Sequence, residues 1–295
     1  PNASLVRGGQ IAERLHIHAS TPRNSPWPHP GTPAAAAWPG DDPTAVRTRA
    51  DDLHALPSAL RSERIKLASL RANRVIVALT AAISAVIAGG LAATADPAEP
   101  ALPASELFIY PLPLVAMLAA VAGILMFTGE AQHGTLAVLL VTRPARWVVV
   151  GAKTITAAVV GFALGVTGMA AGFLGAALGG ADLGGGSHLV SRAAWAATYI
   201  VLAALIGLGV GMIVRHSAAA ITGLLMWSFV VESLFSPLLP DGVLHLLPFS
   251  AGYRLLDAGP QFEAPVVIAD PLGRPAYALI FAGYAVVSLV VGTVL

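Results

Sequence analysis

Charged residues are scarce in this chain, and cysteine is absent. Of its 295 residues, 11% are charged and 56% are hydrophobic, whereas a soluble domain carries roughly a quarter charged residues. The mean hydropathy of +0.74 points the same way. Without cysteine there is no disulfide, no thiolate nucleophile and no Cys-ligated metal. We therefore expect an all-α polytopic membrane protein.

A phosphate-binding loop is also missing. No G-x-x-x-x-G-K-[ST] motif occurs in the sequence, so the chain has no loop of its own to cradle ATP phosphates. The stretch GGADLGGGSH (179–188) lacks the following Lys-Ser/Thr, and GLGVG (207–211) lacks dinucleotide-binding spacing. We expect no cofactor on this chain and no nucleic-acid partner. If ATP drives the protein, another polypeptide holds the nucleotide.

The first 74 residues divide into two parts. Residues 1–56 include a Pro- and Ala-rich run, 21–43, without helical or strand periodicity, which predicts a disordered or extended tail. Residues 57–74 repeat leucine at helical spacing among basic side chains, which predicts an amphipathic helix at the membrane surface. An ordinary positive flank before a membrane span is the alternative. The basic residues of this segment are Arg61, Arg64, Lys66, Arg71 and Arg74.

Six apolar segments follow, each near the length of about 20 residues that crosses a membrane. They are residues 75–95, 107–128, 147–178, 195–214, 218–235 and 276–295. The third is longer than one crossing requires, and the fifth is the shortest.

The distribution of basic residues sets the expected orientation. Nine Arg and Lys residues lie in residues 57–74 and in or next to the second-to-third and fourth-to-fifth connections, against three in the other connections. Basic residues favour the cytoplasmic side. We therefore expect both termini and the loop between segments two and three to be cytoplasmic.

Three features inside or near the segments stand out. Segment three carries Gly161, Gly165, Gly168 and Gly172, small residues that allow close helix packing within the subunit or across a dimer. Glu232 is the only acidic residue inside a predicted segment, and such a charge is a functional candidate. A structural carboxylate near the outer surface is the alternative. The apolar, Pro-containing stretch 243–256 is too short to span and predicts a re-entrant or interfacial element.

The polar stretch 127–147 between segments two and three is the main candidate site. Glu130 and His133 stand three residues apart, a spacing that fits a metal pair, an acid/base pair or two faces of a short helix. Di-metal bundles need this Glu-x-x-His motif twice, and it occurs once. Glu130 early in a short helix would be favoured by the helix dipole, and Pro144 would separate that helix from the third span.

These features together resemble the permease subunits of ABC-2 type exporters, in particular the actinobacterial drug-export group. Members commonly read like GEYRHGT, then ATP-R and a Lys, and this chain reads GEAQHGT (129–135), then VTRPARWVVVGAK (141–153). It departs at Ala131 and Gln132, where Tyr and Arg are usual. SERIKLASLRANR (62–74), VVESLFSPLLP (230–240) and LLPFSAGYRLL (246–256) are also similar to the family. The resemblance covers residues 57 to 295.

The resemblance implies a specific role for the loop. In that family a short cytoplasmic coupling helix between spans two and three docks on a dimer of ATP-binding subunits, which hold ATP and Mg. Two permease subunits pair, as a homodimer or with a paralogue, in the bacterial plasma membrane, and they export an amphipathic or lipophilic compound. The expected coupling residues are Gly129, Glu130, Gln132, His133, Gly134, Thr135 and Arg143.

Two other functions stay open at this point. Glu232 could couple a secondary carrier to protons, although such carriers often show an inverted repeat and none is convincing between segments one to three and four to six. Glu130 and His133 could serve an intramembrane metal enzyme. The permease interpretation assigns no catalytic residue to this chain.

Overall fold

The computed structural model describes residues 57, 71–95, 102–132, 146–183, 188–235, 238–240, 243, 246–256 and 272–295. All of them belong to one compact unit, residues 48–295. The predicted tail, 1–56, lies outside these residues, as do Arg61, Arg64 and Lys66. Arg71 is the first residue of the first long helix, so the last turn of the predicted surface helix continues into the first span.

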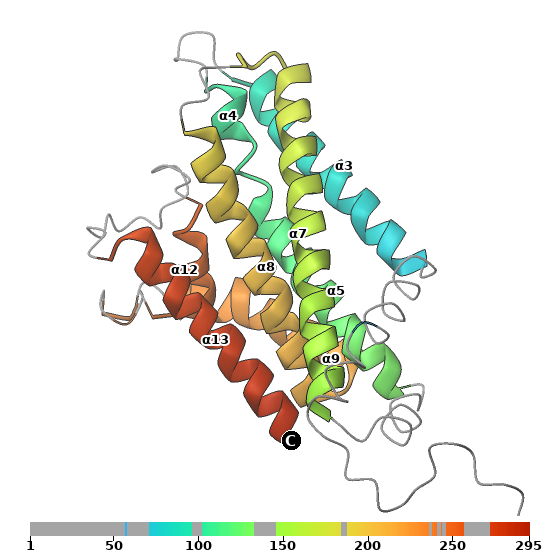
Figure 1. Ribbon diagram of the computed structural model, residues 1–295. Coiled ribbons are helices and arrows are strands. Elements are labelled where there is room, and N and C mark those ends of the chain that lie inside the picture. Colours follow the sequence, from blue (N-terminus) through green and yellow to red (C-terminus); the bar gives the residue numbers. More distant parts are fainter. Residues whose placement is uncertain are drawn as a thin grey trace, which may run out of the picture. The chain divides into compact units, whose positions relative to one another are not determined.

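Every element of the described residues is a helix (Figure 1), as expected. Five helical stretches are long and apolar enough to cross a membrane. Their helices are α3 (Arg71–Ala93), α4 with α5 (Ala104–Leu107 and Leu112–Gln132), α7 (Arg146–Leu178), α8 (Leu189–Val214) and α13 (Arg274–Val294).

The predicted boundaries hold to within a few residues at most ends of these five stretches. The main differences are that α8 begins at Leu189 instead of 195 and that α5 continues to Gln132, beyond the predicted end at 128. The predicted over-long third segment is one helix of 33 residues. At 1.5 Å per residue it measures about 50 Å, well beyond the hydrocarbon thickness of about 30 Å.

The fifth predicted segment, 218–235, is helical but changes type along its length. It begins as α9 (Ser217–Leu225), continues as the π-helix η2 (Met226–Val231) and ends as α10 (Glu232–Phe235). Its apolar stretch, Ser217–Val231, is shorter than the five spanning stretches. In the π-helix, hydrogen bonds run from residue i+5 to residue i, and the Glu232 N–H bonds to the Trp227 carbonyl.

Helix α8 lies at the centre of the packing. It contacts α5, α7, α9 and α13, and its contact with α5 is the most extensive in the described residues. Tyr199 of α8 is buried against Phe281 of α13, with ring centroids 5.5 Å apart. The main apolar core joins α5 and α8 to parts of α7, α9, α12 and α13.

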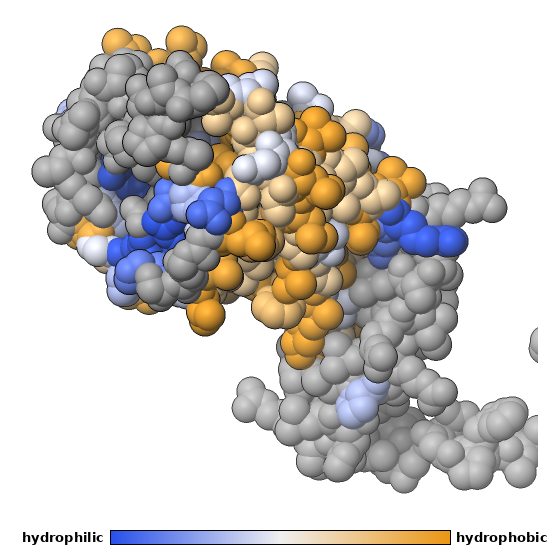
Figure 2. Space-filling view, turned by 90° about the horizontal axis from the view of Figure 1, so that it is seen from above, coloured by the Kyte–Doolittle hydropathy of each residue, from blue (hydrophilic) through white to orange (hydrophobic). Residues whose placement is uncertain are grey.

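The four candidate glycines of α7 all lie against neighbours in the same chain. Gly161 and Gly165 face α8, Gly168 faces Val115 of α5, and Gly172 faces the Phe108 backbone. Packing within the subunit therefore accounts for all four positions. On the face that Figure 2 shows, the described surface is mostly apolar, with hydrophilic side chains gathered in separate patches.

A short helix precedes the last span, where a re-entrant or interfacial element is predicted. Helix α12 (Pro248–Tyr253) is largely buried and packs on α13. Gly252 lies directly against the Tyr199 ring, and the Tyr284 hydroxyl donates to the Leu246 carbonyl at 2.8 Å. The Leu246 carbonyl, in the non-helical backbone before α12, therefore has a hydrogen-bond partner within the protein, as backbone inside a membrane would require.

Candidate functional site

The predicted coupling residues begin in the last turn of α5. Gly129, Glu130 and Gln132 belong to this helix, whereas His133, Gly134, Thr135 and Arg143 lie outside the described residues. Gln132 is exposed, while Gly129 and Glu130 are partly covered. The structure thus describes the helix ends on both sides of the loop, at Gln132 and at Arg146.

Glu130 does not begin a separate short helix, so that part of the prediction is wrong. Helix α5 runs through it without a break and ends two residues later. The C-terminal end of a helix carries negative partial charge, which disfavours a carboxylate. Another group must therefore compensate the Glu130 charge.

Lys153 of α7 provides this compensation. Its ammonium lies 2.8 Å from Glu130 Oε2, and the two side chains are 1% and 16% exposed. The same ammonium donates to the Met126 carbonyl oxygen at 3.4 Å. Charges in apolar helices are costly unless they are paired, and this pair joins the end of α5 to the start of α7.

A second polar contact joins the end of α5 to α9. The Ser217 hydroxyl donates to Gln132 Oε1 at 3.2 Å. Ser217 follows a tight turn in which Arg215 has a φ of 57° and His216 Nδ1 accepts the Ala219 N–H. Glu130 and Gln132 therefore connect one helical turn of α5 to two different helices.

Sequence reasoning did not assign a role to Lys153 beyond its charge. The available signal was its rarity, because the chain has only two lysines and this one lies inside an apolar segment. Its burial depends on the position of α5, which the sequence pattern does not give.

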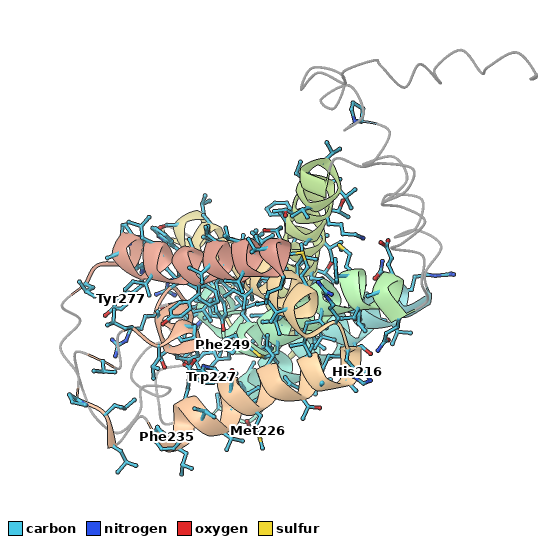
Figure 3. All side chains as sticks on the ribbon, turned by 90° about the horizontal axis from the view of Figure 1, so that it is seen from below. His216, Met226, Trp227, Phe235, Phe249 and Tyr277 are labelled. Carbon is cyan, nitrogen blue, oxygen red and sulfur yellow. The ribbon has the colours of Figure 1, made fainter. Side chains whose placement is uncertain are left out.

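Glu232 occupies a second buried polar cluster with Trp227 and Phe249, two residues that are labelled in Figure 3. Its side chain is 4% exposed. Oε1 accepts the Trp227 indole N–H and the Phe249 backbone N–H, each at 3.0 Å. Oε2 accepts the Ser250 backbone N–H at 2.7 Å and the Ser250 hydroxyl at 2.9 Å.

The Glu232 cluster fastens α12 to the end of the π-helix. Phe249 and Ser250 lie in the first turn of α12, whose N–H groups have no partner within the helix, and the carboxylate accepts two of them. The i to i+5 spacing of the π-helix brings the Trp227 indole over the same carboxylate. Three of the four donors cannot accept a hydrogen bond, which favours a structural role for Glu232 over proton transfer.

Tyr253 at the end of α12 stays protonated. Burial raises the pKa of its phenol above the ordinary value, and the nearby Tyr110 raises it further. The phenol of Tyr253 is therefore uncharged at neutral pH.

Hydroxyl side chains within the spans, which could line a substrate cavity, differ in environment. The hydroxyls of Thr80 and Ser84 are fully buried and have no hydrogen-bond partner in the part of the chain that the structure describes. Those of Thr167 and Thr198 bond to carbonyls of their own helices. A small cavity of about 150 Å³ lies between α3, α5 and α7, and apart from Asn73 its lining is apolar.

The described residues offer no metal site. No group of three His, Asp or Glu side chains gathers within the described ranges, and the Lys153 ammonium beside Glu130 would repel a metal ion there.

Comparison with known proteins adds no family assignment. No protein-family model matches the chain, and no curated protein matches it either.

Proposed function

We propose that this chain is the membrane-spanning permease subunit of an ATP-driven exporter of the ABC-2 type. A separate ATP-binding subunit, present as a dimer with ATP and Mg, docks on the loop between α5 and α7. The stretch 218–235 is the fifth of six spans, and both termini and the docking loop lie on the cytoplasmic side of a bacterial plasma membrane.

The observation that carries the proposal is the pair of polar contacts between the ends of α5, α7 and α9. A buried ion pair and a side-chain hydrogen bond tie these helices together directly beside the loop. Paired charges in apolar helices mark functional positions. The motifs of residues 129–153 are similar to those of the family, and the missing phosphate loop assigns nucleotide binding to another chain.

The mechanism requires that the partner's nucleotide state change the relative free energy of two arrangements of the spans. Closure of the ATP-binding dimer would displace the loop, and α5 and α7 would move with it. A second permease subunit, identical or a paralogue, would complete the pathway. The few polar side chains in the spans favour an amphipathic or lipophilic substrate, such as a drug, peptide or lipid.

Co-purification with the ATPase encoded next to it tests the proposal. We expect a stable complex whose ATP hydrolysis and transport in proteoliposomes require both proteins. His133→Ala and Arg143→Ala should weaken binding of the ATPase, whereas Thr167→Ala, a half-buried residue of α7 whose hydroxyl bonds to its own helix, should not. Transport driven by a proton gradient without the ATPase, and lost in Glu232→Gln, would instead establish the carrier alternative.

A further inference from the structure

Glu130 is held inside the chain rather than presented to a partner. Its carboxylate lies 2.8 Å from the Lys153 ammonium and its side chain is 16% exposed, while Gln132 in the same turn is exposed. Among residues 129–132, Gln132 is therefore the one on the surface.

The pair breaks a local rule of helix stability. Glu130 stands in the last turn of α5, where the helix dipole disfavours a carboxylate, and an exposed Lys or Arg would suit that end better. Replacing a buried pair by apolar side chains is often neutral or stabilising. Such departures from local preference concentrate at functional sites, so the pair is not explained by stability alone.

The position of the pair determines what it can do. Glu130 precedes residues 133–145 and Lys153 follows them, so the pair closes this connection into a loop held at both ends. Farther along the same two helices, Gly168 of α7 packs on Val115 of α5. Because α5 and α7 are in contact both at the ion pair and at Gly168, a displacement of the loop moves the two helices together rather than bending one of them.

We propose that Lys153 is a positioning residue for energy coupling and that the Glu130–Lys153 pair transmits loop movement to both helices. This inference rests on the proposed function, because the movement comes from the ATP-binding partner. It assigns Glu130 an internal role and leaves contact with the partner to other residues, among them the exposed Gln132.

The first experiment tests, without any ATPase, whether the Glu130–Lys153 pair holds α5 and α7 at a fixed distance. Because the chain has no cysteine, spin labels can be attached through Ala131→Cys and Gly151→Cys, and a side chain at 151 meets no atom within 4 Å. The distance distribution between the labels should be narrow in the otherwise native chain and broad in Lys153→Met. It should narrow again in the charge swap Glu130→Lys with Lys153→Glu, which also places a cation at the C-terminal end of α5. An unchanged distribution in Lys153→Met overturns the inference.

The second experiment measures coupling in the full complex. We expect Lys153→Met and Glu130→Gln to bind the ATPase within about threefold of the native affinity and to lower transport per ATP hydrolysed at least tenfold. The charge swap should recover most of the transport per ATP hydrolysed. Breaking the ion pair at the other end of the bundle, Glu106 with Arg192 at 3.4 Å, by Arg192→Met should leave the ratio unchanged.

The outcomes separate this inference from the proposed function. If the single variants lose ATPase binding in proportion to transport and the swap does not restore it, Glu130 is a contact for the partner and the inference is wrong. If the native chain binds no ATPase, the proposed function is wrong, and so is the coupling role that rests on it. The label distances still show whether the pair holds the two helices together.

Discussion

Two glutamates in apolar helices are stabilised in different ways. Glu130 is neutralised by a cation from another helix, at 2.8 Å, whereas Glu232 accepts four hydrogen bonds, two of them from backbone N–H groups. A buried charge requires a counter-charge or a full set of donors. The stability of the Glu130 charge therefore depends on the position of Lys153 in α7, and that of Glu232 depends on the position of α12.

The Glu232 cluster gives a prediction for stability. Glu232→Ala leaves the buried Phe249 N–H without its acceptor, and each unsatisfied buried donor costs about 1–3 kcal/mol. We expect Glu232→Ala to lower the thermal unfolding midpoint in detergent strongly, and Glu232→Gln to lower it less because one oxygen remains. Thr167→Ala, whose hydroxyl bonds only to its own helix, is the control. A midpoint for Glu232→Ala equal to that of the control would show that the cluster does not hold α12.

The Trp227 hydrogen bond can be tested separately from the ring. Trp227→Phe keeps an aromatic side chain and removes the N–H that donates to Glu232 at 3.0 Å. A hydrogen bond to a charged group contributes about 1.5–3 kcal/mol. We expect a measurable loss of stability that largely disappears when the same change is made in the Glu232→Ala background. Equal losses in both backgrounds would mean that the ring, and not the hydrogen bond, matters.

At the scale of helices, α5 and α8 approach closely because two glycines allow it. A Cβ on Gly207 would overlap the Ala120 backbone, and one on Gly123 would overlap that of Ala204. Small residues at such positions permit the packing that stabilises membrane helices. The most extensive contact of the bundle therefore depends on residues that contribute little apolar area themselves.

Gly207→Ala should separate these helices. Overpacking of this kind typically costs about 1–3 kcal/mol, and the backbone of Ala120 cannot move aside as a flexible side chain would. Gly223→Ala in α9 is the matched control, because nothing lies within 4 Å of its added Cβ and Ala favours a helix interior by up to about 1 kcal/mol over Gly. We expect opposite shifts of the unfolding midpoint in the two variants. Equal shifts would contradict the packing account.

The sequence predicted the positions of the helices better than it predicted which residues of different helices contact each other. Length and hydropathy located all five long stretches because burial in a membrane demands continuous apolar runs. They did not reveal that α5 continues from 128 through Gly129 and Glu130 to Gln132, because the polar residues there were assigned to the connection between segments two and three. They also could not pair Glu130 with Lys153 or Glu232 with Ser250, because these contacts join separate helices.

For the whole molecule, contacts group the helix ends into two sets. Glu130, Lys153, Gln132 and Ser217 meet at one end. At the other end the Ala104 N–H donates to the Asp182 carbonyl at 2.7 Å, and Arg192 pairs with Glu106. The excess of basic residues near the first end favours a cytoplasmic position for it.

Cysteine labelling in intact cells tests this arrangement, because the native chain has no reactive thiol. Leu183→Cys replaces an exposed residue that follows α7, and we expect a membrane-impermeant thiol reagent to label it from outside. Gln132→Cys and Ala218→Cys, also at exposed positions, should react only after the membrane is permeabilised. Labelling of all three from outside would mean that α7 and α5 do not separate the two ends across a membrane. Labelling of only Gln132→Cys and Ala218→Cys in intact cells would instead reverse the orientation, and the docking loop would then lie where no ATP-binding subunit could reach it.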